Sequence, residues 1–471
     1  MRTDEPTATG RSPWTRWPHC LPALLPALSL FVVAVAPLVL HWLGNVDDQR
    51  LVDLDVYRTG GEAVLRGRPV YDFVTPAPQL LPFTYPPVAA LLATPLAAIS
   101  WPAAQWAWTA LIFLTLAVTV WLSFRAVFDR IAPAGGPGRG EEPDARDRPA
   151  GADGRGGRGA RHVLSRLWVP LLFAALMIAC TYLMPIRDQV RFGQVDILLV
   201  ALCLADCAAR RPMWPRGLLI GLATAVKLTP GVFLVYLLIT ALGPGARRER
   251  REAFLTAALT AALLTLLPFL VIPADAADFW FRALLDPERL GANAATTNQS
   301  MRGMLIRLYL PDTPTTLLWI ALVAVVAWYG FRYARRALLD GRPVAGVALV
   351  GLMAVLLSPV AWIHHLAWVV VVIGALAGDG RDPVRVRVAV GVWLYYVLPI
   401  PWWGVTIKAA EIPVLSPVLG KIVQNGFGLG ALVLVWLLGV WLPGREAAHL
   451  RQGPSRETGR PHGGTGRTAG E

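Results

Sequence analysis

The chain has 471 residues, of which 55% are hydrophobic and only 16% are charged. Soluble domains are about one quarter charged, so this composition excludes an ordinary soluble globular protein. The formal net charge is +13. The basic residues lie in loops and tails, where they set membrane topology and contact anionic lipid, so we expect no nucleic-acid partner.

Long apolar runs recur along the whole chain and predict an all-α polytopic membrane protein. They lie near residues 21–43, 84–99, 103–127, 167–185, 194–208, 217–241, 253–272, 314–331, 343–359, 363–377, 386–401 and 424–442. A spanning helix needs about 20 apolar residues, and the first run is long enough to remain as a helix after a polar N-terminus. We therefore expect about twelve transmembrane helices with both termini in the cytoplasm.

The chain is expected to divide into a transmembrane domain at 21–443 between two disordered cytoplasmic tails at 1–20 and 444–471. The Arg- and Gly-rich segment 128–166 is expected to be a disordered loop, because its composition cannot bury a core.

Two topologies remain open. The Arg-rich loops 242–252, 332–342 and 378–387 are cytoplasmic by the positive-inside rule. The simple count of twelve helices, however, puts 128–166 outside, against that rule. In the alternative, 84–99 dips into the membrane without crossing and 217–241 forms a hairpin of two half-helices at Pro230. This alternative places segment 128–166 on the cytoplasmic side together with the three Arg-rich loops.

Residues 44–83 lie on the outer side in either topology and carry several acids. A short helix is predicted from Leu54 to Leu65, with Asp53 as its N-cap and Gly67 at its end. Its apolar residues fall along one side, which suits an amphipathic helix lying on the membrane surface.

Three polar groups are predicted to meet on this outer side. They are the acids Asp53 and Asp55, the pair His364 and His365, and the stretch 298–302. A carboxylate can accept a proton from a hydroxyl. Cations and hydrogen-bond donors can stabilise a departing phosphate. This combination indicates transfer from a lipid-phosphate donor to a hydroxyl acceptor.

Lys227 can reach the same place if it lies at the end of a half-helix, and an intramembrane lysine is a functional candidate. Each candidate also has a structural interpretation. Asp53 can cap a helix, the histidines can pack against tryptophans, and Lys227 can extend to the membrane interface. No nucleotide-binding or metalloprotease motif is present, and the four cysteines lack zinc or redox spacing. We therefore expect neither a metal nor a cofactor.

An ordered set of short motifs resembles a known family. The motifs are Asp53–Tyr57, Phe83–Pro87, Gly193–Asp196, Lys227–Pro230, Asn298–Ser300 and Ser358–His365. In this order they resemble glycosyltransferase family 87, the actinobacterial mannosyltransferases that depend on polyprenyl-phosphate mannose. The resemblance covers roughly residues 20–445.

The resemblance implies a C-type glycosyltransferase fold and inverting transfer of mannose from a polyprenyl monophosphate. The acceptor would be a glycolipid or lipoglycan, and the new linkage α-1,2. The base is implied at Asp53, with Asp55 as second choice, and a catalytic histidine at His364 or His365. We further expect the donor phosphate to be bound by Lys227 and Arg302, and the substrate pocket to be formed by Tyr57, Tyr85, Gln194, Asn298 and Gln299. Asp196 stands where the family often has Asn, which can alter acceptor choice.

Two other functions fit part of the pattern. One is a transferase for another polyprenyl-phosphate sugar, such as arabinose. The other is a lipid or solute transporter, but transporters place polar groups at the bilayer midplane and show internal repeats. Here the acids lie in an outer loop and no repeat is evident. We therefore expect a multi-pass cell-membrane enzyme whose active site faces the outer side.

Overall fold

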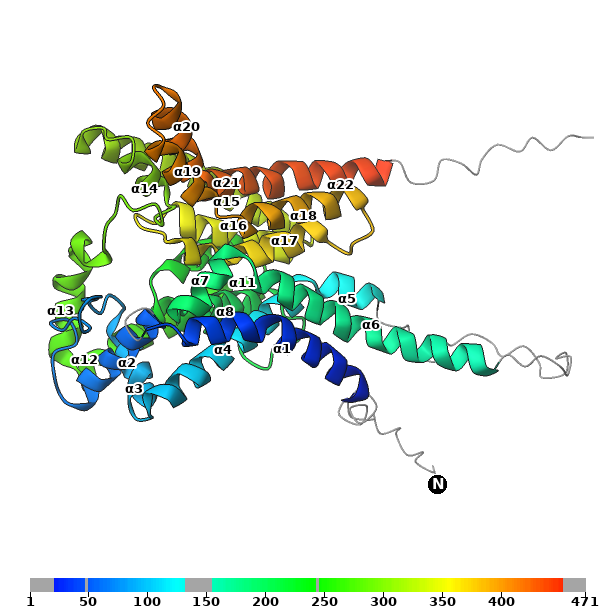
Figure 1. Cartoon of the computed structure of the whole chain (residues 1–471), viewed down its shortest axis with the longest axis horizontal. Helices are drawn as coiled ribbons and strands as arrows, with labels where there is room; N and C mark the ends of the chain where they lie inside the picture. The colour runs from blue at the N-terminus through cyan, green and yellow to red at the C-terminus, as the bar shows by residue number, and fades with distance from the viewer. Residues whose placement is uncertain (1–20, 47–49, 132–154, 243–244, 452–471) are drawn as a thin grey trace, which may run out of the picture.

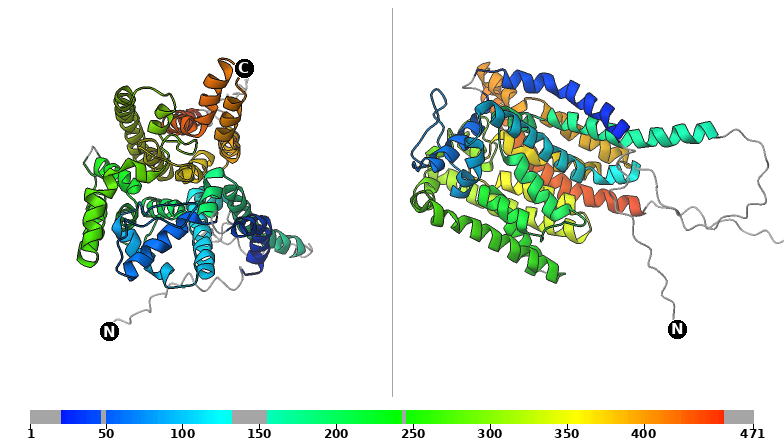
Figure 2. Two further views of the ribbon diagram at one scale, coloured as in Figure 1. Left: turned by 60° about the vertical axis from the view of Figure 1, so that its left-hand side comes forward. Right: turned by 90° about the horizontal axis from the view of Figure 1, so that it is seen from below.

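The structure is a computed structural model that describes residues 21–46, 50–131, 155–242 and 245–451. Within these ranges it is helical and contains no β-strand, only isolated bridges between Val74 and Pro82 and between Asn298 and Trp362. The predicted all-α class is therefore confirmed. The long helices run side by side along the long axis of the molecule (Figure 1 and Figure 2).

The first half of the chain contains helices α1 to α10. Their bounds are α1 Leu21–Leu43, α2 Val52–Leu65, α3 Pro87–Ala97, α4 Trp101–Ser123, α5 Arg125–Ile131, α6 Arg155–Thr181, α7 Met184–Phe192, α8 Asp196–Ala208, α9 Leu218–Val226, η2 Thr229–Gly231 and α10 Val232–Leu242.

The second half contains α11 to α22. Their bounds are α11 Arg248–Leu266, α12 Pro268–Val271, α13 Pro273–Phe281, η3 Ala283–Leu285, η4 Pro287–Leu290, α14 Met301–Ile306, α15 Asp312–Leu339, α16 Pro343–Leu356, η5 Ile363–Trp368, α17 Val369–Ala377, α18 Pro383–Val397, α19 Ile400–Ala409, α20 Leu415–Gln424, α21 Gly426–Trp436, η6 Leu437–Trp441 and α22 Leu442–Arg451.

The described residues contain fewer full-length spans than the predicted twelve. Five helices are long and apolar enough to cross a membrane, or seven if each of two bent helix pairs counts as one span. The difference arises because several apolar runs fold into short helices. The run near 84–99, for example, forms the 11-residue α3. That helix is about 16 Å long, roughly half the hydrocarbon thickness of a bilayer.

The run at 217–241 is divided at Lys227–Gly231, and the chain reverses there. Gly217, just before α9, and Gly221, within it, pack against successively later residues of α11, so these two helices run in the same direction. The end of α10 lies beside the start of α11, where Arg251 Nε donates to the Ala241 carbonyl (3.3 Å). Helix α10 therefore runs opposite to α9, as the hairpin topology requires.

The two ends of the molecule differ in what they carry. Helices α2, α3, α12 and α13 gather at one end, and α5, the start of α6 and the end of α22 lie at the other (Figure 1). The described flanks of 128–166 are thus at the same end as the C-terminal helix, which agrees with the hairpin topology.

Helices also extend into two segments predicted to be disordered. Helix α6 begins at Arg155 and α22 continues to Arg451. Residues 1–20, 132–154 and 452–471, on which the rest of those predictions falls, lie outside the described residues.

Helices α16 and α17 form the centre of the bundle. Every residue from Ala345 to Leu356 and from Val369 to Leu376 is buried. A helix that is apolar all round suits either the core of a protein or contact with lipid, and these two helices are enclosed by protein. The outer helices instead expose leucines, such as Leu255, Leu259 and Leu263 on one face of α11. Such a surface matches contact with lipid chains.

Helix α2 differs from its prediction in two ways. It starts at Val52 after Leu51, whose φ is 50°, so Asp53 lies inside the first turn and makes no capping hydrogen bond. Its small-residue face does not lie on the membrane surface, because it is covered by protein. A Cβ added at Gly60 would meet the Phe83 ring at 2.7 Å, and one at Gly61 the Ala93 carbonyl at 2.5 Å.

Candidate active site

A cavity of about 930 Å³ lies at the end of the molecule that carries α2 and α13. Its wall combines the start of α2, the segment before α3, the tip of the α9–α10 hairpin, the segment after α13 and the segment before α17. The polar side chains that line it include Asp53, Gln194, Lys227, Arg289, His364 and His365. A pocket of this size with a few convergent polar groups is the usual form of a small-molecule site.

The start of α2 brings Asp53 to this cavity. The Leu51 amide donates to the Arg191 carbonyl (3.0 Å), which ties the helix start to the end of α7. Gly193 follows with φ 73°, and a Cβ there would lie 2.9 Å from Leu54 Cβ. The Gly-Gln pair therefore needs glycine at its first position, because only glycine permits both the conformation and the approach. Gln194 is thereby placed beside Asp53.

Burial raises the pKa of Asp53 from its ordinary value to about 7. A hydrogen bond from the Gln194 side chain and the positive charge of Lys227 act in the opposite direction but are outweighed. A carboxyl with a pKa near neutrality is suited to general-base catalysis, because it can gain and lose a proton at working pH.

Two tyrosines join Asp53 to the rest of the cavity. Tyr57 and Tyr85 hydroxyls lie 2.9 Å apart, and they donate to Gln194 Oε1 over 3.1 and 3.3 Å. With its carbonyl oxygen used in this way, the Gln194 amide nitrogen is left to donate to Asp53. Lys227 Nζ lies 5.3 Å from the centre of the Tyr85 ring. All three predicted pocket residues of this group therefore lie at the site.

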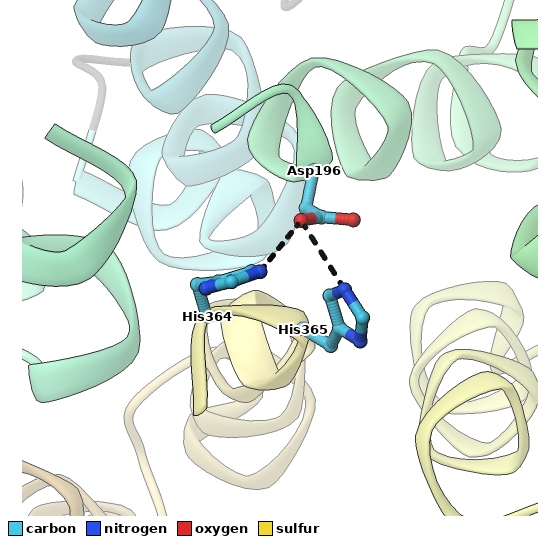
Figure 3. Close-up of side chains that lie close together, drawn as sticks. All are labelled: Asp196, His364 and His365. Carbon is cyan, nitrogen blue, oxygen red and sulfur yellow. Dashed lines mark ion pairs between the residues drawn. The ribbon is translucent and has the colours of Figure 1, made fainter. Parts of the chain in front are cut away.

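A second group at this cavity, which we call the lysine cluster, consists of Asp196, Lys227, His364 and His365. Lys227 Nζ is 2.7 Å from Asp196 Oδ1 and 3.1 Å from His365 Nε2. Both imidazole Nε2 atoms lie 3.8 Å from Asp196 Oδ2 (Figure 3). Asp196 Oδ2 and His364 Nε2 are buried and have no hydrogen-bond partner among the described residues. An unsatisfied buried polar atom in a native site calls for a ligand or water.

The lysine cluster also contains atoms of the types that bind metals. One ligand atom each from Asp196, His364 and His365 lies within 4.8 Å of the others. Lys227 contacts the same carboxylate and the same imidazole, so its ammonium already supplies a positive charge there. A second cation would be repelled by it at this separation, and the set therefore fits a lysine-centred site better than a metal site.

Asn298 and Gln299 are fully buried behind the cavity and do not line it. Asn298 Oδ1 accepts from the Ala361 amide (3.0 Å), and the Gln299 amide donates to the Ala361 carbonyl (2.7 Å). Ser300 Oγ donates to the Pro359 carbonyl (3.0 Å). These residues hold the segment that leads into His364. They are therefore placed to position His364 and do not line the substrate pocket.

Arg302 and Asp55 lie away from the cavity lining. The Arg302 guanidinium lies over the Trp319 ring, 5.6 Å from its centre. Asp55 lines a separate, smaller cavity with Trp101. Of the two acids, the structure therefore brings only Asp53 to the lysine cluster.

Asp196 and Arg289 are among the residues at the site that the sequence did not predict. Asp196 was noted only as a departure from the family, although an acid in an apolar run is a signal of function. Arg289 lines the cavity and donates through Nη2 to the Tyr71 carbonyl (2.8 Å). Its sequence context does not distinguish it from other arginines between the apolar runs.

Comparison with known proteins gives a consistent result. Residues 83–359 match glycosyltransferase family 87. The chain is 37% identical over 338 residues to the polyprenol-phosphate-mannose-dependent alpha-(1-2)-phosphatidylinositol mannoside mannosyltransferase of Mycobacterium tuberculosis, covering 70% of this chain and 72% of that protein.

The enzyme of the same name from Mycolicibacterium smegmatis is 36% identical, covering 70% of this chain and 71% of the relative. A pentamannoside mannosyltransferase of Mycobacterium tuberculosis is 29% identical, covering 74% and 72%. No solved structure is significantly similar. The family match covers more than half of the chain, which therefore belongs to glycosyltransferase family 87.

Proposed function

We propose that this protein transfers mannose from a polyprenyl monophosphate to a hydroxyl of a glycolipid, forming an α-1,2 linkage with inversion. The observation that carries the proposal is that Asp53 and the lysine cluster share one cavity. A base for the acceptor and a cation for the leaving group thus line the same cavity. The names of the relatives favour mannose over arabinose as the sugar.

The proposed architecture is the C-type glycosyltransferase fold with the active site on the outer face. It has twelve passes, made by α1, α4, α6, α8, α9, α10, α11, α15, α16, α17, α18 and the α21–α22 helix. Several of these are shorter than a bilayer is thick and are surrounded by longer helices. Arg-rich segments at one end of the bundle favour that end as cytoplasmic.

In the proposed reaction the acceptor hydroxyl lies between Asp53 and the anomeric carbon of the donor. Asp53 accepts the hydroxyl proton as the oxygen attacks the carbon from the face opposite the phosphate. The new carbon–oxygen bond forms while the bond to the phosphate oxygen breaks, and its electron pair leaves with the phosphate. General-base help of this kind is worth about 10²–10⁴ in rate.

The leaving phosphate is anionic and needs positive charge and hydrogen-bond donors. Lys227 supplies the charge, and His364 and His365 supply ring nitrogens beside it. The unpartnered His364 Nε2 faces the cluster and can donate to a phosphate oxygen in one tautomer. Arg289 adds a second cation on the cavity wall.

The central experiment compares Asp53→Asn with Asp55→Asn. Membranes carrying each variant receive radiolabelled polyprenyl-phosphate mannose and phosphatidylinositol mannosides. We expect Asp53→Asn to lower the transfer rate by about 10²–10⁴-fold, because it removes the base. Asp55→Asn should keep the chemical step. If Asp53→Asn transfers mannose at the wild-type rate, the proposed mechanism is wrong.

The orientation is tested with single cysteines at exposed positions near the two ends. Asp72→Cys lies on the segment between α2 and α3, and Asp340→Cys on the turn between α15 and α16. A membrane-impermeant maleimide should label the first in intact cells and the second only after permeabilisation. The reverse pattern would place the active site on the cytoplasmic face.

A further inference from the structure

A second cavity of about 250 Å³ lies on the other side of the start of α2. It is lined by Val52, Asp55, Thr75, Pro76, Ala77, Gln79 and Trp101. Its volume is several times the ~30 Å³ that a water molecule occupies in the liquid. It is therefore large enough for an organic group of roughly the size of a sugar ring.

This second cavity adjoins the catalytic one. Gln79 lines both cavities, and the Asp53 and Asp55 side chains line one each. Residues two apart on a helix point to nearly opposite sides, while their backbones are separated by only about 3 Å along the axis. A ligand that reacts beside Asp53 can thus extend past Gln79 into the second cavity.

The lining has the chemistry that recognises a neutral polyol. Trp101 offers an aromatic surface for the C–H face of a sugar. Asp55 offers a carboxylate for its hydroxyls. The Asp55 carboxylate makes no hydrogen bond to any described residue in the structure, so its acceptor capacity is available. A carboxylate at this place repels a lipid phosphate and disfavours an anionic ligand.

Burial raises the pKa of the Asp55 carboxyl above its ordinary value, and the positive charge of Arg58 opposes this effect. The carboxyl is therefore partly removed from water, as a group that binds hydroxyls in a cleft is expected to be. Val52, Pro76 and Ala77 complete an apolar wall, so the cavity combines one aromatic ring, one acid and an apolar floor.

We propose that this second cavity is a subsite for the glycan arm of the acceptor, holding a mannose residue that is already attached. The inference rests on the proposed function, because only a glycan acceptor provides such an arm. It assigns Asp55 and Trp101 to acceptor recognition and leaves Asp53 with the chemical step.

The experiment uses the purified full-length protein and a series of alkyl glycosides with one, two or three mannose residues as acceptors. For the wild type, we expect KM to fall as the arm lengthens, while kcat stays nearly constant. In Trp101→Ala and Asp55→Ala, the decrease in KM from the shortest to the longest acceptor should become smaller by about twofold to tenfold. For the shortest acceptor these variants should behave like the wild type.

Controls separate a lost subsite from a damaged fold. Trp101→Phe keeps an aromatic surface and should restore part of the decrease in KM. Glu62→Gln changes an acid of the same helix that lines neither cavity, and it should leave the whole acceptor series unchanged. Equal losses of kcat for short and long acceptors in Trp101→Ala would overturn the subsite.

A binding measurement separates this proposal from the proposed function. Saturation-transfer difference NMR with a free mannose oligosaccharide should show contact with the wild type and weaker contact with Trp101→Ala. If the wild type transfers no mannose but still shows this difference, the proposed function fails and the subsite stands. If transfer occurs but neither KM nor binding depends on arm length or on Trp101, the subsite is wrong.

Discussion

Two buried polar clusters near the end of the bundle that carries the catalytic cavity differ in how completely their hydrogen bonds are satisfied. The lysine cluster faces the catalytic cavity and keeps two buried atoms without partners, Asp196 Oδ2 and His364 Nε2. The second, which we call the amide cluster, consists of Asn298, Gln299, Arg307 and Asn425. Arg307 Nε donates to Asn425 Oδ1 (2.7 Å), and its other nitrogens donate to the Ala295 and Asn298 carbonyls (2.6 and 2.7 Å).

The comparison shows that a buried polar residue in a membrane protein is not by itself a sign of catalysis. Apart from the bond between Arg307 and Asn425, the amide cluster uses its donors and acceptors on the protein's own backbone, so it stabilises the loops around it. The lysine cluster keeps hydrogen-bonding atoms without a partner next to the cavity, and a substrate can bind to these atoms. Satisfaction of hydrogen bonds, rather than polarity, distinguishes the two.

The largest effect on stability is expected in the amide cluster. Arg307→Met leaves two acceptors, Asn425 Oδ1 and the Asn298 carbonyl, without a donor among the described residues, each costing about 1–3 kcal/mol. It also removes one of the two donors to the Ala295 carbonyl. The yield of folded protein and the midpoint of thermal unfolding in detergent should both fall markedly. Any molecules that do fold should keep the wild-type KM for the donor. A variant with normal thermal stability but no activity would instead place Arg307 in the chemistry.

The lysine cluster should respond in the opposite way. His365→Ala removes the ring nitrogen beside Lys227, and we expect transfer to slow by about 10²–10³-fold, as for loss of one electrostatic donor. Thermal unfolding should change little, because the ring borders the cavity. Should His365→Ala unfold the protein as Arg307→Met does, the distinction between the clusters would fail.

The pH dependence of kcat/KM isolates Asp53. The base must be the carboxylate, and burial raises its pKa to about 7. Below that pH the rate should fall about tenfold per pH unit, and above it the rate should level off. The residual activity of Asp53→Asn should lack this slope. A profile that is already flat from pH 5 upward would show that Asp53 does not titrate in catalysis.

The same shift has the opposite effect on stability. Because the folded-state pKa of Asp53 is above its unfolded value, its contribution to stability is fully present below the ordinary pKa of an aspartate. This contribution is lost as the pH rises through about 7. The expected loss of activity in acid is therefore not explained by unfolding driven by Asp53.

The smallest effect is expected at Arg302, which the sequence assigned to donor phosphate. Its guanidinium lies over Trp319, away from the cavity lining. Arg302→Gln should change the donor KM by no more than about twofold, as surface substitutions usually do. A tenfold rise in that KM would return Arg302 to the phosphate site and show that the cavity extends further in the bound state.

The sequence predicted well whatever depends on local pattern. The apolar runs gave the helical membrane class, and the motif order gave the family. It also placed Asp53, Tyr57, Tyr85, Gln194 and Lys227 at the site, each of which lines the cavity or bonds to a residue that does. The hairpin at Pro230 could be proposed because a lysine and a proline interrupt one apolar run.

The features that could not be predicted from the sequence depend on side-chain direction and on long-range contacts. Asp53 and Asp55 differ only by two positions on one helix, and which of them meets Lys227 is decided by where that helix starts. Arg289 and Arg302 look alike in sequence, yet only the first lines the cavity. Only five to seven of the expected spans are long enough to cross a bilayer in the described residues, because several apolar runs fold into short helices that pack on protein.

The left-handed conformation of Leu51 has a consequence for engineering the loop before α2. Each residue of an α-helix rotates the next side chain by about 100°. Inserting or deleting one residue between Leu51 and Asp53 would swing the carboxylate away from the cavity while leaving the helix intact. Tags, linkers and length changes in this loop should therefore be placed before Leu51, where they do not alter the direction in which Asp53 points from the helix.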